Sequence, residues 1–291
     1  MVRTRVLLGA VMIAAVVGLV WLDARLAAGP GVGAGGGGLT GAIARGGLIA
    51  LVFAALAAGG AVELTRLLAA ADAKPVGWWM GLVSAGLILT PALAAPGAQW
   101  GSEELASLLV LTAGLAGAMA LAAGRAPTPE SVRSLAATTL GILYLGVLGS
   151  FAVRLRATGP AGPWLVLYFV GVVKSTDIGA FFVGKFLGKH KLAPRLSPGK
   201  TIEGLAGGIA AATIVAVIAG RLLGGMETWQ LVCFGPVMAI VGQGGDLAES
   251  LLKRAAGAKD SGSTIPAFGG VLDLLDSPLL AAPFAWALLA R

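Results

Sequence analysis

Long apolar stretches separated by short polar segments make up most of this chain. A membrane-spanning helix needs about 20 predominantly apolar residues, and nine stretches come close to that length. They cover residues 6–22, 46–62, 78–95, 105–124, 134–153, 164–183, 204–223, 230–247 and 273–290. A bilayer core offers the backbone no water for hydrogen bonding, which favours helices in such stretches. The pattern predicts an all-α, polytopic integral membrane protein with about nine transmembrane helices.

Composition points to the same class. Hydrophobic residues make up 57% of the chain and charged residues 12%, and the mean hydropathy is +0.89. Soluble domains carry about 25% charged residues, and disordered chains are polar and highly charged. Both classes are therefore excluded. The single cysteine, Cys233, excludes an intrachain disulfide, and the single histidine, His190, excludes a multi-histidine metal site.

The Lys and Arg residues of the loops predict the orientation. With a cytoplasmic amino terminus, 14 of them fall on the inner side and 6 on the outer side, with Lys174 inside a span. This is the asymmetry that the positive-inside rule describes. It also accounts for the net charge of +7, so we expect no nucleic-acid partner. The first span is expected to be retained, because Trp21-Leu22-Asp23 is a poor signal-peptide cleavage site. The glycine-rich residues 29–41 are expected to form a flexible outer linker.

Charged residues are concentrated in two short stretches. Residues 174–203 and 246–276 together hold 16 of them, although the whole chain has 21 basic and 14 acidic residues. Both stretches lie at the inner membrane face in the predicted orientation. Ionisable groups in or beside a bilayer are costly, so we expect a functional site here. We divide the chain accordingly into amino-terminal transmembrane helices, residues 1–160, and a carboxy-terminal catalytic region, residues 161–291.

The first stretch has a basic segment followed by Ser-Pro-Gly-Lys-Thr at residues 197–201. Glycine lets a backbone approach phosphate closely, and Lys200 offers a point charge to phosphoryl oxygens. A helix is expected to begin near Thr201 and Glu203, where free N–H groups favour anions. A Walker A loop would need glycine in place of Pro194. A phosphate site and a polybasic loop that contacts anionic lipid both fit this pattern.

The second stretch repeats acidic residues at helical spacing. Asp246, Glu249 or Ser250, and Lys253 share one helix face, and Asp273 and Asp276 open the last span. Acidic side chains gathered near lipid repel one another unless a cation joins them. Mg²⁺ prefers oxygen ligands and takes one or two carboxylates together with substrate phosphates. We favour Mg²⁺ over the alternative, which is neutralisation by the neighbouring basic side chains Lys253, Arg254 and Lys259.

Together, these residues predict a Mg²⁺-dependent phosphoryl or nucleotidyl transfer site at lipid head-group depth. Catalysis at such a site consists of positioning and charge neutralisation.

Two motifs in the correct order support a more specific hypothesis. The second stretch contains Ser250-Leu-Leu-Lys253-Arg254, Lys259-Asp260-Ser-Gly262, Pro266, Gly269-Gly270, Asp273 and Asp276, preceded by Gly245-Asp246-Leu-x-Glu249. The first contains Asp177-x-Gly179, Gly184-Lys185, Gly188-Lys-His-Lys191 and Ser197-Pro-Gly-Lys-Thr-x-Glu203-Gly204. From about residue 174 to 284 the chain resembles the phosphatidate cytidylyltransferase family, also called CDP-diacylglycerol synthase.

The resemblance implies that CTP and phosphatidic acid are condensed to CDP-diacylglycerol and pyrophosphate. A phosphatidate oxygen would attack the α-phosphorus of CTP without a general base, since the phosphate monoester is already ionised at neutral pH. It also implies roles for individual residues. The implied metal ligands are Asp246, Asp273, Asp276 and Asp177. The implied catalytic residues are Asp246, Asp273, Lys253, Lys259 and Asp260, with Glu249 in support. The implied substrate-binding residues are Ser197, Lys200, Thr201, Ser250, Arg254, Gly269 and Gly270.

The chain departs from the family signature at two positions. Phe268 stands where the family has His, and Leu274 stands where it has Arg. If the family's His and Arg contact substrate phosphates, other cations must replace them here. The residues available for this are His190, Arg195 and Arg254.

Two other functions use the same features. A different CTP-using membrane lipid enzyme, such as a polyprenol or phytol kinase or a CDP-archaeol synthase, would differ in its acceptor. A transporter would use Lys174, Asp177 and Asp246 as an ion path, but the charges cluster at one face and no internal repeat is visible.

The remaining expectations concern the setting of the site. The family likeness favours the bacterial inner membrane with the site facing the cytoplasm. K⁺ as a second cation and a homodimer are both compatible with the sequence. Glu63 is expected to pair with Arg66 at i+3, without a catalytic role.

Overall fold

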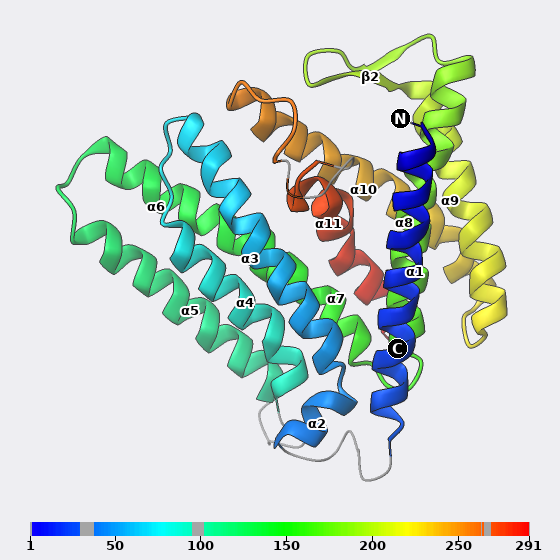
Figure 1. Cartoon of the computed structure of the whole chain (residues 1–291), viewed down its shortest axis with the longest axis horizontal. Coiled ribbons are helices and arrows are strands. Elements are labelled where there is room, and N and C mark those ends of the chain that lie inside the picture. The colour runs from blue at the N-terminus through cyan, green and yellow to red at the C-terminus, as the bar shows by residue number, and fades with distance from the viewer. Residues whose placement is uncertain (1, 30–37, 95–101, 263, 265–268, 291) are drawn as a thin grey trace.

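Helices form nearly all of the described chain and run side by side as a bundle (Figure 1). The computed structural model describes residues 1–291 except 1, 30–37, 95–101, 263, 265–268 and 291. Its helices are α1 (Val2–Ala27), α2 (Gly38–Ala44), α3 (Gly47–Ala70), α4 (Gly77–Leu93), α5 (Ser102–Ala123), α6 (Pro129–Gly141), the π-helix η1 (Ile142–Val147), α7 (Leu148–Arg156), α8 (Gly162–Leu187), α9 (Ile202–Leu223), α10 (Thr228–Ala255) and α11 (Val271–Leu289). The strands are β1 (Lys191–Ala193) and β2 (Ser197–Thr201).

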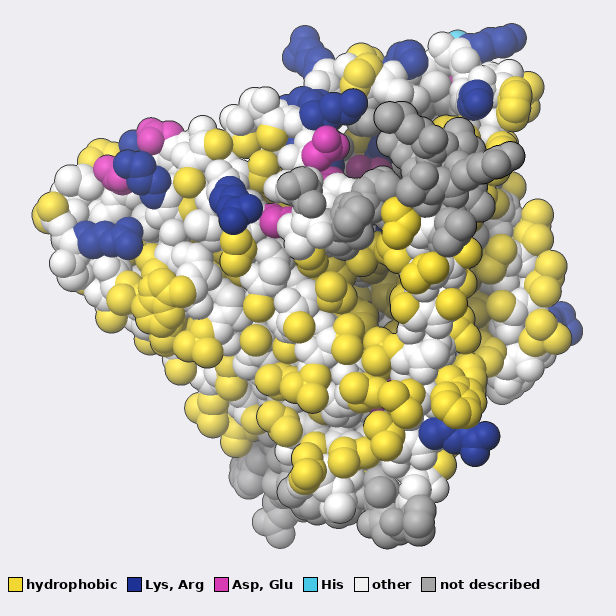
Figure 2. All heavy atoms as spheres, viewed as in Figure 1, with side chains coloured by type: hydrophobic (Ala, Val, Ile, Leu, Met, Phe, Trp, Pro, Cys, Tyr) yellow, Lys and Arg dark blue, Asp and Glu magenta, His cyan; other side chains and the backbone are white. Residues whose placement is uncertain are grey.

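The predicted spans coincide with these helices. Within the described residues, 8 helices are long and apolar enough to cross a membrane, one of them formed by α6, η1 and α7 together, and α4 is a shorter apolar helix. The prediction of an all-α polytopic membrane protein is confirmed. Figure 1 shows α1 beginning at one end of the bundle and α11 ending at the other, as an odd number of crossings requires. In Figure 2, hydrophobic side chains cover the flanks of the bundle.

A β-hairpin projects from one end of the bundle, which we call the hairpin face (Figure 1). Its strands are antiparallel, with Lys191 opposite Thr201 and Ala193 opposite Ser197. Three and five residues are too few to show an alternating pattern, so the sequence predicted only a loop here. The helix predicted after this segment is confirmed, because the Thr201 hydroxyl caps α9 by accepting a hydrogen bond from the Gly204 N–H at 3.0 Å. Most of the visible charged side chains lie at this face in Figure 2.

The last helix, α11, is packed into both apolar cores. Leu272 and Leu279 belong to the first core, with residues of α3, α4 and η1. Ala281 and Ala285 belong to the second core, with residues of α7, α8, α9 and α10. The amino-terminal and carboxy-terminal halves of the chain therefore meet around α11, and the first turn of this helix lies at the hairpin face.

A buried ion pair ties helices together at the opposite end. Arg156 at the end of α7 pairs with Asp23 of α1, and the two side chains are 2% and 1% exposed. Asp23 also accepts a hydrogen bond from the Ile49 N–H of α3 at 3.3 Å. Arg156 is one of the six basic residues that the predicted orientation places on the outer side, and its charge is compensated inside the protein by Asp23. The predicted linker falls largely outside the described residues, and α2 begins within its last part.

Candidate active site

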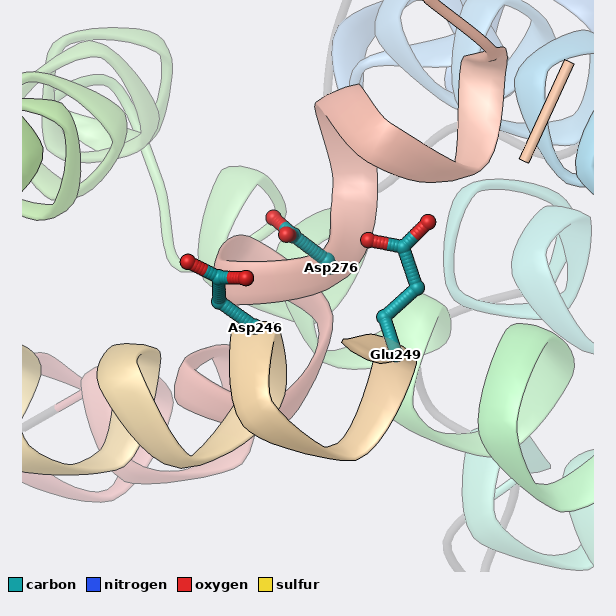
Figure 3. A group of neighbouring side chains, drawn as sticks. All are labelled: Asp246, Glu249 and Asp276. Carbon is teal, nitrogen blue, oxygen red and sulfur yellow. The ribbon is translucent and has the colours of Figure 1, made fainter. Parts of the chain in front are cut away.

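Three carboxylates converge between α10 and α11 near the hairpin face. One oxygen each from Asp246, Glu249 and Asp276 lies within 4.8 Å of the others, and Figure 3 shows the three groups directed into the space between the two helices. We call them the carboxylate cluster. Glu249 is fully buried, and its Oε1 has no hydrogen-bond partner. A buried, unsatisfied carboxylate oxygen is costly, so a cation would stabilise this arrangement.

A glycine allows α10 and α11 to approach closely enough to form the cluster. A Cβ at Gly245 would overlap the carbonyl oxygen of Asp276. On α11, Pro278 lies two residues after Asp276 and lacks the backbone N–H that a regular helix uses for hydrogen bonding. The backbone next to Asp246 therefore packs directly against the backbone of Asp276.

Two lysines neutralise part of this charge. Lys200 Nζ of β2 lies 2.5 Å from Asp246 Oδ2, and Lys253 Nζ lies 3.1 Å from Glu249 Oε2 and 2.7 Å from Asp273 Oδ1. Among the described residues, no lysine or arginine forms an ion pair with Asp276. Neutralisation by basic side chains therefore accounts for only part of the cluster. Its all-oxygen donor set and the unsatisfied Glu249 oxygen fit a hard divalent cation.

Asp273 has a different environment from the cluster. Its Oδ2 accepts hydrogen bonds from the Gly270 N–H at 2.7 Å and from the Ser261 hydroxyl and N–H at 2.7 and 3.2 Å. Gly269, which precedes this turn, has φ +102°, a conformation that favours glycine. Asp273 thus organises the start of α11 while holding Lys253. The structure does not group it with the three carboxylates of the cluster.

A pocket of about 480 Å³ lies beside the cluster. Residues of α8, the hairpin, α9 and α10 line it, and they are Asp177, Ala180, Phe181, Gly184, Lys185, Ser197, Gly199, Lys200, Thr201, Gly204, Leu205, Gln243 and Asp246. Five of these, Asp177, Ser197, Lys200, Thr201 and Asp246, are site residues that the sequence predicted. Phe181 is 61% exposed, so the pocket reaches the apolar flank of the bundle.

Ser250, Arg254, Lys259 and Asp260, which the sequence also predicted as site residues, do not line the pocket. The Ser250 hydroxyl is 3.5 Å from Asp246 Oδ1. Arg254 donates hydrogen bonds to the carbonyls of Leu196 at 3.2 Å and Ala258 at 3.1 Å, which joins the hairpin to the loop after α10. Lys259 and Asp260 are exposed in that loop.

Asp177 on α8 lines the pocket, 3.7 Å from Lys174. It is not one of the three carboxylates that the structure groups together. Its predicted role as a metal ligand stays a prediction.

The chain departs from the family signature at Phe268 and Leu274, and the structure describes only the second of these residues. Phe268 lies outside the described residues, and Leu274 is half-buried on α11. The His190 ring contacts Glu203 at 2.6 Å at the base of the hairpin, and Arg195 is exposed in the hairpin turn. Together with Arg254, these cations belong to the hairpin or bind it.

Two residues near the site were missed by sequence reasoning. Tyr144 lies on η1 with a buried hydroxyl that has no hydrogen-bond partner, and it interacts electrostatically with Asp276 and Glu249. Nothing in the sequence distinguishes it from an ordinary aromatic residue of an apolar span.

Glu63 on α3 is the second missed residue. It forms no ion pair with Arg66, so that prediction is wrong; instead it accepts hydrogen bonds from the N–H groups of Val271 and Leu272 at 3.0 and 2.9 Å. A lone carboxylate within an apolar span was the available signal.

Comparison with known proteins places these features in a family. The model of the cytidylyltransferase family matches residues 32–291, a range that includes every site residue named above. A phosphatidate cytidylyltransferase of Bacillus subtilis (strain 168) is 41% identical over 163 residues, which is 52% of this chain and 57% of that protein. One of Brucella suis biovar 1 (strain 1330) is 43% identical over 142 residues, covering 49% and 53%. One of Staphylococcus aureus (strain COL) is 35% identical over 243 residues, covering 82% and 89%. The chain spans little more than half of the first two relatives and most of the third.

Proposed function

This chain belongs to the cytidylyltransferase family, and on that premise we propose that it condenses CTP with phosphatidic acid to give CDP-diacylglycerol and pyrophosphate. The observation that carries the proposal is the contact between Lys200 and Asp246 in the pocket wall. It joins the hairpin, whose Ser-Pro-Gly-Lys-Thr segment is suited to binding phosphate, to a carboxylate cluster suited to a cation. Both partners of a nucleotidyl transfer to a lipid phosphate are anionic, and this pocket supplies the two kinds of group that bind them.

We further propose that Asp246, Glu249 and Asp276 hold Mg²⁺. When bound, the ion would neutralise phosphate oxygens and favour attack at phosphorus. The carboxylate cluster supports this ligand set through its all-oxygen composition and the unsatisfied Glu249 oxygen. Asp273 and Asp177 stay predicted ligands, and in the present arrangement Asp273 holds Lys253. K⁺ as a second cation stays a prediction.

The chain's own residues would orient and neutralise the reacting phosphates. Lys200 would move from Asp246 to triphosphate oxygens, and the hydroxyls of Ser197 and Thr201 lie in the same pocket wall. An oxygen of the phosphatidate monoester would form a bond to the α-phosphorus as the bond between that phosphorus and the leaving pyrophosphate breaks. The attacking phosphate is already ionised, so no side chain has to remove a proton. Catalysis would rest on positioning and charge, as is usual in phosphoryl transfer.

The geometry of the pocket supports separate routes for the two substrates. CTP, a soluble anion, would enter from the hairpin face, which we propose faces the cytoplasm of a bacterium. The lipid would approach from the flank, where the Phe181 side chain is exposed on the surface of the bundle. A homodimer stays a prediction.

The direct test uses purified protein in detergent with labelled CTP, phosphatidic acid and Mg²⁺. We expect CDP-lipid and pyrophosphate from the wild type and a loss of both in Asp246→Asn. Lys189→Ala is the matched control, because this lysine is exposed outside the pocket. If wild-type protein forms no CDP-lipid above the Asp246→Asn background, the proposal is wrong. Transfer to another lipid would reject phosphatidic acid as the acceptor.

A further inference from the structure

Glu63 connects the amino-terminal half of the chain to the loop between α10 and α11. Its side chain is buried, with 2% of the residue exposed, on α3. Besides the two N–H groups at the start of α11, its carboxylate accepts a hydrogen bond from the Thr264 hydroxyl at 2.7 Å and lies 3.2 Å from the Ser261 hydroxyl, whose single hydrogen it shares with Asp273. Four donors from one short region thus converge on one carboxylate. A negative charge at a helix amino terminus is also stabilised by the helix dipole.

Two glycines of the loop make room for this carboxylate. A Cβ at Gly262 would lie 2.7 Å from Glu63 Oε1, and a Cβ at Gly270 would overlap both Glu63 Oε2 and the Ser261 hydroxyl oxygen. The close fit gives a physical reason for glycine at both positions of the Lys-Asp-x-Gly and Gly-Gly motifs. The described loop residues Ser261, Gly262 and Gly270 thus fit closely around a residue that lies some 200 positions earlier in the chain.

The contacts continue from Glu63 to the carboxylate cluster. The Ser261 hydroxyl lies within hydrogen-bond distance of both Glu63 and Asp273, at 3.2 and 2.7 Å. Asp273 holds Lys253 at 2.7 Å, and Lys253 in turn contacts Glu249 of the cluster at 3.1 Å. Displacing Glu63 would therefore release the turn that orients Asp273 and, through it, Lys253.

We propose that Glu63 is a positioning residue for the transfer reaction: it anchors the loop before α11 so that Asp273 and Lys253 keep their orientation toward the carboxylate cluster. This inference rests on the function proposed above. Glu63 lines neither the pocket nor the cluster, so it acts through the groups that it holds. Groups that orient metal ligands in this way typically contribute about 10- to 100-fold to activity or metal affinity.

The experiment compares Glu63→Gln with Asp23→Asn. Asp23 is the matched control, because it is also a buried carboxylate that accepts a backbone N–H bond, but at the opposite end of the bundle. Glutamine at position 63 replaces one carboxylate oxygen with an NH₂ group, which cannot accept a hydrogen bond. The N–H of Val271 or of Leu272 is then left without an acceptor. Three quantities are measured: amide exchange at Ser261, Gly270 and Val271; the stabilisation of the protein by Mg²⁺ in thermal unfolding; and kcat with the Mg²⁺ concentration for half-maximal activity.

For Glu63→Gln we expect faster exchange at these amides, and a fall of about 10-fold or more in kcat or in Mg²⁺ affinity. Asp23→Asn should lower the unfolding temperature while leaving the loop exchange and the Mg²⁺ response unchanged. Wild-type exchange and a wild-type Mg²⁺ response in Glu63→Gln would overturn the proposal, as would equal Mg²⁺ effects of the two variants.

A milder variant covers the case in which Glu63→Gln does not fold. Ser261→Ala removes only the hydroxyl between Glu63 and Asp273, and we expect a smaller change in the same direction. No change in Mg²⁺ response or loop exchange in Ser261→Ala would then reject the proposal. Exchange and Mg²⁺ stabilisation require no turnover, so they test the role of Glu63 even if wild-type protein forms no CDP-lipid, an outcome that would reject the proposed function instead.

Discussion

The ammonium group of Lys200, on the second strand of the hairpin, lies 2.5 Å from a carboxylate oxygen of Asp246 on α10. The contact brings together two sequence motifs that are separated by more than forty residues. It also places the flexible, positively charged side chain of Lys200 beside carboxylates that are suited to Mg²⁺. A polyphosphate that enters the pocket would therefore meet both the lysine and the metal ion. Lys200 is therefore the residue whose removal should weaken phosphate binding most directly.

Lys200→Met should lower kcat/KM for CTP by about 10²-fold, because one charged donor to the transferring phosphates is lost. Steady-state kinetics with varied CTP checks this. Lys189→Ala, which removes an exposed cation of the same basic segment, should change kcat/KM by less than about 3-fold, as expected for a solvent-screened charge. Equal losses in the two variants would mean that the segment attracts anions only through its overall charge.

The two tyrosines of the chain allow a matched comparison of buried hydroxyls. The Tyr144 hydroxyl has no partner and lies near the carboxylate cluster, whereas the Tyr168 hydroxyl donates to the Ala216 carbonyl at 3.1 Å. Tyr144→Phe should reduce kcat by about 10-fold or more, because we expect this unpartnered hydroxyl to donate a hydrogen bond to a charged group once the substrates and cation are bound. Its unfolding temperature should not fall.

Tyr168→Phe should show the opposite pattern, with unchanged kcat and a loss of about 1 kcal/mol in the free energy of unfolding. Kinetics and thermal unfolding on the same preparations separate the two outcomes. Full activity of Tyr144→Phe would show that this hydroxyl has no role in the reaction.

Gly245→Ala should lower kcat of the proposed transfer by roughly 10²-fold while leaving the polar groups of the site in place. The added methyl would overlap the carbonyl oxygen of Asp276 and push α10 away from α11. A displacement of about 1 Å at a reacting centre can cost roughly 10²-fold in rate. Gly171→Ala on α8 is the control, because a Cβ there meets nothing within 4 Å. If both variants keep wild-type kcat, the close approach of the two helices is not required.

Removing one partner of the buried ion pair at the far end should destabilise the protein without changing its chemistry. Arg156→Met leaves the Asp23 carboxylate uncompensated and should cost about 3–5 kcal/mol. Asp23→Leu combined with Arg156→Met should recover most of that loss, because no charge is then left buried. Thermal unfolding in detergent provides the measurement, and a double variant no more stable than Arg156→Met would contradict this account.

The sequence predicted the spans well because lipid imposes a strong constraint on composition. Each stretch of about 20 apolar residues had to become a helix. It could not predict the hairpin, whose short strands are held by pairing with each other and by the contacts of Glu203 with the backbone of Lys189 and His190.

The sequence predicted only part of the site. It predicted the contacts between residues that are close in the chain, but not those that depend on how distant helices pack. Asp246 and Glu249 share a helix face, so their spacing alone brought them together. The position of Asp276 opposite them depends on how α10 packs on α11, and Asp273 is drawn toward Lys253 and Ser261 instead. Glu63 and Tyr144 reach the site only through tertiary packing, and no spacing relates them to it.

The central claim is tested most directly by following the two ends of CTP separately. Purified protein is incubated with phosphatidic acid, Mg²⁺ and CTP labelled at either the α- or the γ-phosphorus. We predict that the α-label enters the lipid, that the γ-label leaves as pyrophosphate in equal amount, and that Asp246→Asn abolishes both. Transfer of the γ-label to lipid would identify a kinase, and the absence of any labelled lipid with active, folded protein would contradict nucleotidyl transfer at this site.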